Sequence, residues 1–151
     1  MIAEAGFMEP RLSIITLGVS DLKRSFEFYH DGLGLPTTKT PEDGIIFFQT
    51  SGVCLALYPF EKLVEDVDPT LTDVSPPKFP AVTVAHNTKT KPEVDELLKR
   101  AEAAGGKIVK PAQDVFWGGY SGYFSDPDGH LWEVAYADAW KFHPDGSLVI
   151  E

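Results

Sequence analysis

The stretch "GYFSDPDGHLWEVAY", residues 122–136, places a turn sequence between two short apolar runs. In the turn "DPDG", Pro127 fits the second position of a β-turn and Gly129 can take a positive φ. Short runs rich in aromatic and β-branched residues are typical of strands. The stretch therefore predicts a β-hairpin with one unusual member, the carboxylate of Glu133 inside its second strand.

Glu133 is the first candidate functional residue. Because side chains alternate along a strand, Glu133 lies on the face opposite to Trp132 and Val134, which suit packing against helices. An unpartnered carboxylate in an apolar interior is costly, and its pKa rises. Glu133 is therefore expected to meet a metal ion, a basic group, a hydroxyl or a ligand. A structural carboxylate bonded to Ser, Tyr or Trp donors is the alternative.

The hairpin has a counterpart earlier in the chain. "IIFFQTSGVCLALYP", residues 45–59, aligns with residues 122–136, and Ala56 then matches Glu133. A β-rich run and an amphipathic helix precede each hairpin. This internal repeat predicts an α+β fold of two βαβββ modules, whose curled mixed sheets enclose a cavity. The expected strands and helices are residues 11–19, 21–35, 44–50 and 53–60, followed by 79–87, 90–106, 107–115 and 120–136.

The 151 residues fit one domain of common size. We place the first module at residues 11–59 and the second at 79–137. The acidic, proline-containing segment 60–78 is interpreted as a linker with at most a short helical turn. In the tail, residues 138–151, Asp145-Gly146 marks a turn, and "SLVI" is a candidate short edge strand. The linker and the tail are the expected covers of the cavity mouth or of a partner.

The composition excludes several classes of function. The net charge of −10 repels phosphate backbones, so no nucleic-acid partner is expected. No apolar run is long enough for a transmembrane helix, and the first residues lack the pattern of a signal peptide. Cys54 is the single cysteine and is interpreted as a core residue. Together these features predict a cytoplasmic protein without a membrane partner.

The repeat and the ending "FWGGYSGYFSDPDGHLWEVAY" resemble the vicinal oxygen chelate superfamily, as does the opening "ITLGVSDLKRSFEFYHDGLGL". This superfamily includes glyoxalase I, the bleomycin-resistance proteins, the fosfomycin-resistance enzymes and the extradiol dioxygenases. The resemblance covers residues 11–137. It implies the glyoxalase/bleomycin-resistance fold and a homodimer in which two chains share each cavity. One fold hosts several chemistries, so the resemblance alone does not settle the activity.

Metal-using members of the superfamily hold a divalent ion with His, Gln or Glu side chains from the first and last strands of the modules. By this resemblance Glu133 falls on the last-strand ligand position. The first-strand position is Ile14, the matching position of the second module is Phe79 or Ala81, and the remaining one is Ala56. None of these can bind a metal, so Glu133 is a metal ligand only if a metal is bound at all. No cofactor is therefore expected. The alternative is that the protein binds a divalent metal ion, namely Zn, Ni, Mn, Fe or Mg.

His86 and His130 are the histidines that could replace the missing ligands. His130 borders the turn on the face opposite to Glu133, and His86 shares the face of Val84. His30 and His143 are interpreted as surface residues. A metal site in which a histidine supplies a missing ligand is accordingly a minor alternative.

Aromatic and small residues near the hairpin are the candidate ligand contacts. The segment "VFWGGYSGYF" alternates rings with glycines, which allow close approach of a ligand or of backbone. Trp117 is the preferred ring, and Ser121 or Tyr123 could donate a hydrogen bond, depending on which face of the strand turns inward. The full candidate set is Phe116, Trp117, Tyr120, Ser121 and Tyr123, and core packing is the alternative role for about half of the rings.

Three functions are consistent with these sequence features. The first is a metal-free binder of a small aromatic or hydrophobic molecule, similar to the bleomycin-resistance proteins. The second is a metal-free enzyme in which Glu133 acts as the general base. The third is a metal-dependent lyase, isomerase or dioxygenase of the glyoxalase type whose ligands are not yet identified.

Overall fold

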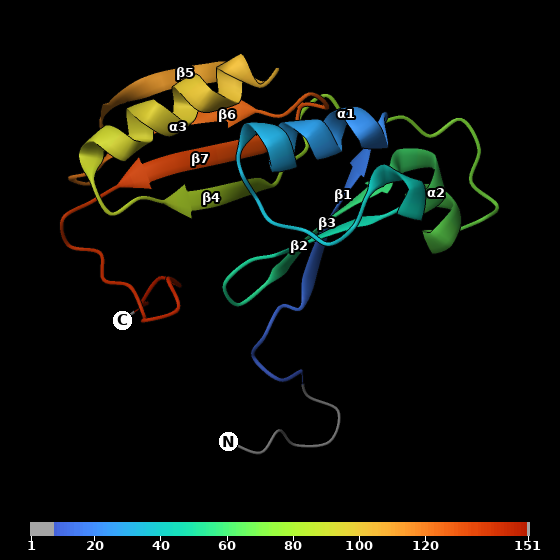
Figure 1. Ribbon diagram of the computed structural model, residues 1–151, viewed down its shortest axis with the longest axis horizontal. Helices are drawn as coiled ribbons and strands as arrows, with labels where there is room; N and C mark the ends of the chain where they lie inside the picture. The colour runs from blue at the N-terminus through green and yellow to red at the C-terminus, as the bar shows by residue number, and fades with distance from the viewer. Residues whose placement is uncertain (1–7, 151) are drawn as a thin grey trace.

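The computed structural model describes residues 8–150, which form two β-sheets with helices packed against them (Figure 1). The first sheet contains β1 (Ile14–Val19), β2 (Ile46–Gln49) and β3 (Cys54–Pro59) in the order β1-β3-β2. β1 runs parallel to β3, and β2 runs antiparallel to it. α1 (Leu22–Phe26) continues as the π-helical turn η1 (Glu27–Gly32) and follows β1.

The second sheet contains β4 (Thr83–Asn87), β5 (Lys107–Asp114), β6 (Tyr120–Ser125) and β7 (Leu131–Tyr136) in the order β4-β7-β6-β5. β4 runs parallel to β7, and the other neighbours are antiparallel. α3 (Lys91–Ala103) connects β4 to β5 and packs on this sheet. The mixed α+β architecture is confirmed, and the hairpin predicted at residues 120–136 is formed by β6 and β7.

The first module has one strand fewer than the repeat predicts. Where the second module has β5, the first has an irregular segment with the short 3-10 helix η2 (Pro41–Asp43). Pro36 and Pro41 lack the backbone N–H that a sheet ladder needs, and Gly44 has a φ of 78°. The expectation of two complete βαβββ modules is thus corrected to βαββ followed by βαβββ.

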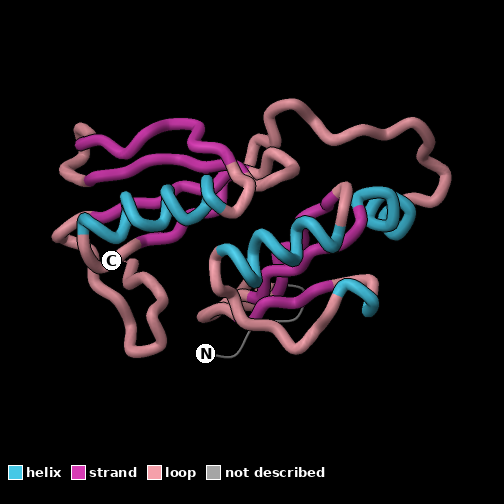
Figure 2. The backbone as a smooth tube through the Cα atoms, turned by 45° about the horizontal axis from the view of Figure 1, so that its top comes forward, coloured by secondary structure: helices cyan, strands magenta, loops and turns pink. Residues whose placement is uncertain are grey.

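The segment interpreted as a linker begins with a two-turn helix, α2 (Phe60–Val67). A Cβ built on Gly18 would lie 3.0 Å from the Phe60 ring and 3.3 Å from a Leu63 methyl. Gly18 therefore lets α2 pack closely on β1. The rest of the connection to β4 is a long loop (Figure 2). The expectation of no more than one helical turn here was wrong.

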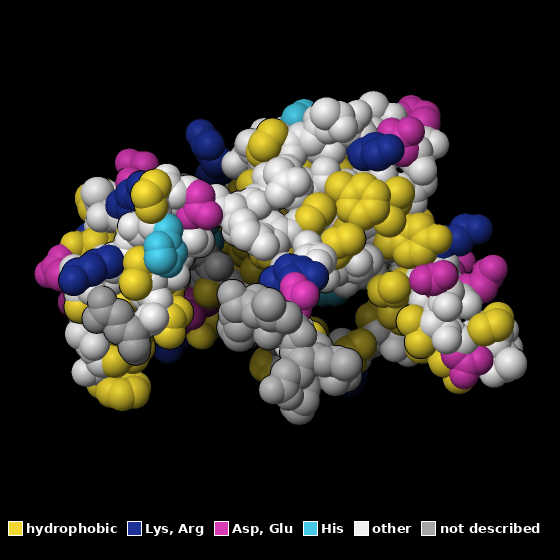
Figure 3. Space-filling view, turned by 90° about the horizontal axis from the view of Figure 1, so that it is seen from below, with side chains coloured by type: hydrophobic (Ala, Val, Ile, Leu, Met, Phe, Trp, Pro, Cys, Tyr) yellow, Lys and Arg dark blue, Asp and Glu magenta, His cyan; other side chains and the backbone are white. Residues whose placement is uncertain are grey.

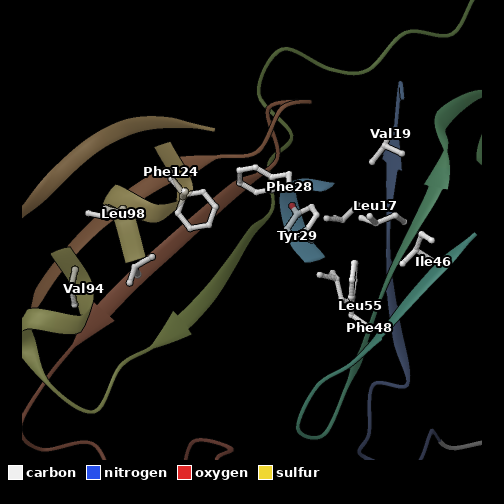
Figure 4. Packing of buried hydrophobic residues seen from close by; sticks show 13 residues of the cluster. Leu17, Val19, Phe28, Tyr29, Ile46, Phe48, Leu55, Val94, Leu98 and Phe124 are labelled. Carbon is white, nitrogen blue, oxygen red and sulfur yellow. The ribbon is translucent and has the colours of Figure 1, made fainter. Parts of the chain in front are cut away.

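The two modules share one hydrophobic core, which is centred on Phe28 and Tyr29 of η1 (Figure 4). Leu17, Ile46 and their neighbours approach these rings from the first sheet. From the second module, Phe124 lies 6.2 Å from Phe28 between ring centroids. The helical turn thereby joins both sheets through buried aromatic surface, which is the main source of stability in such an interface.

The "DPDG" turn fastens the second module to the start of α1. The Tyr29 hydroxyl donates to Asp126 at 2.7 Å, and the backbone N–H and hydroxyl of Ser20 donate to Asp128 at 2.9 and 2.7 Å. His130 Nε2 lies 2.8 Å from the Gly18 carbonyl oxygen. The turn sequence thus has a role beyond reversing the chain, because its carboxylates bind the other module.

The tail forms a small hairpin of its own and adds no strand to either sheet. Phe142 pairs with Leu148 in a single antiparallel bridge, and His143 and Ser147 close the turn between them. The edge strand predicted for "SLVI" is therefore replaced by this local pairing. Among residues 8–150, none of the helices has the length and apolar character needed to cross a bilayer.

Candidate functional site

Glu133 lies half-buried in the middle of β7, between two strands. Its cross-strand neighbours are Ala85 on β4 and Tyr123 on β6. Trp132 turns the opposite way, and its Nε1–H donates to the Tyr29 hydroxyl at 3.0 Å. Val134 is fully buried in the core. Strand alternation therefore places Glu133 on the face of the sheet that α3 does not cover, and we call this the open face of the second sheet.

Tyr123 lies directly across from Glu133 on the neighbouring strand β6, and its phenol is the group nearest in sequence register to the carboxylate. Burial raises the pKa of Tyr123, and the charge of Glu133 and the hydrogen bond to it raise this pKa further. The pair leaves most acceptor sites of the carboxylate free, since an ionised carboxylate can accept about four hydrogen bonds. Ala85 beside Glu133 leaves space for a ligand atom. The arrangement can therefore accept hydrogen bonds from a cationic or polar group.

Ser121 belongs to the same face as Tyr123, because the two residues are two positions apart on β6. Ser121 pairs with Ala135 and is almost completely buried. Its hydroxyl therefore lies beneath the surface of the open face, beside the Tyr123–Glu133 pair.

Three other predicted contacts lie elsewhere. Tyr120 faces α3, where its hydroxyl donates to Asp95 at 2.7 Å and Lys91 Nζ lies 4.6 Å from its ring centroid. Tyr120 is thus separated from Glu133 by the sheet itself, which corrects its assignment to the ligand site. Phe116 is fully exposed in the turn before β6. Trp117 stacks on Trp140 of the tail at 5.5 Å between ring centroids.

The family's metal positions do not fit a metal in this chain. Ala56 pairs with Thr16 just as Glu133 pairs with Ala85, so the residue equivalent to Ile14 in the second module is Thr83. Phe79 and Ala81 precede β4, which corrects the register expected from the sequence. In the described range 8–150, no three or more His, Cys, Asp or Glu side chains come together in a way that could hold an ion. Glu133 alone is a poor site, because tight sites use three or four protein ligands.

The histidines do not complete such a site. His86 pairs with Val134 and so lies on the face opposite to Glu133. It is exposed on the edge strand, yet partial desolvation of the ring lowers the pKa of His86, and the charge of Glu93 opposes this shift. His30 is half-buried, with Nδ1 2.8 Å from the Leu35 carbonyl oxygen, and is therefore not the surface residue that was expected. His143 is exposed, as predicted.

A cavity lies between the modules. It has a volume of about 600 Å³, within the range of small-molecule sites. Residues from both sheets, α3 and the tail surround it, and Glu133 and Tyr123 are not among them. A cavity enclosed by curled sheets, with the tail as a cover of its mouth, was expected from the sequence. Its lining residues could not be predicted, because they depend on how two distant modules and the tail meet.

Comparisons with known proteins agree with this architecture. Residues 11–134 match the family model described as Glyoxalase/Bleomycin resistance protein/Dioxygenase superfamily. The chain is 34% identical over 126 residues to a protein named glutathione transferase FosA from Serratia marcescens. The aligned region covers 82% of this chain and 78% of that protein. These matches show the class: the chain belongs to the glyoxalase/bleomycin-resistance/dioxygenase superfamily.

Solved structures agree with this assignment. A glyoxalase-related enzyme from Fulvimarina pelagi has 37% identity and a TM-score of 0.84, with 94% of this chain and 99% of that chain covered. A glyoxalase/bleomycin resistance protein/dioxygenase from Nocardioides has 27% identity and a TM-score of 0.70, with 89% of each chain covered. The family resemblance seen in the sequence is therefore confirmed.

Proposed function

We propose that this protein binds a small, mainly aromatic or hydrophobic organic molecule on the open face of its second sheet, without the family's metal. The observation that carries the proposal is the Tyr123–Glu133 pair beside Ala85. A half-buried carboxylate with free acceptor sites favours a ligand that carries a cationic or hydrogen-bond-donating group. The net charge of −10 favours the same class of ligand.

A second copy of the chain completes the site in this proposal. The open face bears no helix above Glu133, and large apolar side chains are more than half exposed at Ile14, Phe79 and Val82. Hydrophobic side chains gather in several groups on the side of the molecule seen in Figure 3. Exposed apolar groups of this kind are typical of interaction surfaces. Pairing two chains would turn an open sheet into a closed site.

Catalysis by Glu133 as a general base is the alternative function. The names of the relatives favour it, because one is a glutathione transferase and another a glyoxalase-related enzyme. A phenol and a carboxylate on adjacent strands, as Tyr123 and Glu133 are, can also pass a proton between them once a ligand brings them together. For this alternative function, the bound molecule has an activated C–H or O–H bond within reach of Glu133.

Isothermal titration calorimetry in the presence of EDTA separates these functions. Metal-free bleomycin serves as the cationic aromatic probe, and glutathione as an anionic one. We expect one bleomycin molecule to bind per chain, with the same affinity in the presence and in the absence of EDTA. Glu133→Gln should weaken binding by about tenfold or more, since a hydrogen bond to a charged group contributes about 1.5–3 kcal/mol. Glu102→Gln, on the exposed side of α3, is the matched control.

Other results would change the conclusion. Bleomycin affinity that is equal in wild type and Glu133→Gln would contradict the assignment of Glu133. If binding requires a stoichiometric metal, measured by elemental analysis of the purified protein, the protein uses the metal chemistry of its family and the metal-free proposal is wrong. Turnover of the hemithioacetal of methylglyoxal and glutathione that survives EDTA and is lost in Glu133→Gln would establish the enzyme instead.

A further inference from the structure

The cavity between the modules has walls of unusual composition. Apolar side chains come from β1, the loop after η1, β3, β4, α3, β6, β7 and the tail, and they include the Trp132 ring. Polar side chains are amides, hydroxyls, one thiol and one imidazole, contributed by Gln49, Asn87, His86, Cys54, Ser147 and the β2–β3 turn. No Asp, Glu, Lys or Arg is among the lining residues, although 24% of the whole chain is charged. Such walls cannot compensate the desolvation of an ion, so they disfavour a charged occupant.

The tail closes one side of this cavity. Phe142 and Leu148, the paired residues of the tail hairpin, line it. The hairpin is held in place by a hydrogen bond from the Ser51 hydroxyl to the Asp145 carbonyl oxygen and by Lys89, whose Nζ lies 5.7 Å from the centroid of the Phe142 ring. Stacking of Trp117 on Trp140 fixes the start of the same segment. The cover is thus attached by few contacts, which would let it open and admit a ligand.

We infer that the cavity between the modules, whose lining includes Ala85 but neither Glu133 nor Tyr123, is a second binding site for an uncharged apolar or aromatic small molecule. Its volume suits a ligand of that class, and its amides and hydroxyls can bind a carbonyl or hydroxyl group on such a ligand. Cys54 lines the cavity and is the single cysteine of the chain, so its thiol reports on occupancy.

The test uses N-phenyl-1-naphthylamine, an uncharged apolar fluorophore, with the full chain. We expect saturable binding of one probe per chain that saturating bleomycin does not displace. Bound probe should slow modification of Cys54 by N-ethylmaleimide by about fivefold or more, as expected when a ligand buries most of its own surface in a pocket. Absence of saturable binding, or binding that leaves the Cys54 rate unchanged, would overturn the proposal.

Two variants locate the probe. Val53→Trp places an indole in the cavity and should weaken probe binding by about tenfold, because a filled cavity does not accept further volume without strain. Val67→Trp, at an exposed position of α2, is its control and should bind as wild type does. Leu148→Lys, outside both sheets, introduces a charge into the cavity wall and should also weaken binding, whereas Ile150→Lys, which is exposed, should not. Equal affinities in all four variants would place the probe elsewhere and refute the site.

Discussion

Asp128 is predicted to stabilise the contact between the modules far more than an ordinary surface carboxylate. Its side chain is only 11% exposed and accepts hydrogen bonds from Ser20, Ser25 and Arg24. Removing this carboxylate leaves the buried Ser25 hydroxyl and the exposed donors of Ser20 and Arg24 without this acceptor. Breaking a buried charged pair costs about 3–5 kcal/mol, and we take the lower end for Asp128→Ala because Arg24 is half-exposed.

Asp114 provides the matched comparison. It also accepts from a basic side chain, Lys91 Nζ at 3.2 Å, but its side chain is 83% exposed. Exposed ion pairs contribute about 0–1 kcal/mol. Since 1 kcal/mol corresponds to about 2–4 °C in a chain of this size, Asp128→Ala should lower Tm by about 6–12 °C, and Asp114→Ala by at most about 4 °C. Differential scanning calorimetry of both variants checks this, and equal shifts would show that the Asp128 contacts do not join the modules.

Two further predictions concern the same core. Burial raises the pKa of Asp126, against the opposing hydrogen bond from Tyr29, so Asp126 contributes stability that is present at low pH and lost as the pH rises through its folded-state pKa. Asp126→Asn should flatten that part of the pH profile of urea unfolding, and an unchanged profile would contradict the raised pKa. Gly122→Ala would place a Cβ 2.8 Å from the Lys110 carbonyl oxygen and 2.9 Å from the Ala112 nitrogen, and should destabilise by about 1–3 kcal/mol. Gly18→Ala, which meets mainly flexible side-chain ends, should cost less in the same unfolding assay.

The second module was predictable because its local signals agree. The turn "DPDG" and the alternating strand fix which face carries Glu133, and the helix expected at residues 90–106 is α3, Lys91–Ala103. The same alternation rule places Tyr120 on the face of Phe124, opposite to Tyr123, and would have removed Tyr120 from the candidate site.

The first module was less predictable because long-range contacts replace local signals. α2 carries Phe60, Leu63, Val64 and Val67 at helical spacing, so this helix was predictable from residues 60–67, whereas the prolines of the segment lie beyond its end. The missing strand before β2 could not be inferred from the repeat, since the repeat aligns only the hairpins. Stacking of Trp117 on Trp140 joins residues of two segments whose relation the sequence does not encode locally.

The asymmetry between the two modules determines how many ligands the proposed dimer can hold. Ala56 and Glu133 occupy equivalent strand positions, so only the second module contributes a carboxylate. If the open face of one chain's second module meets the first module of its partner, two-fold symmetry generates two such sites, each with one carboxylate opposite aliphatic side chains. The proposed pairing therefore requires one ligand per chain. A calorimetric stoichiometry of one ligand per two chains would instead place the ligand on the symmetry axis and exclude this pairing of modules.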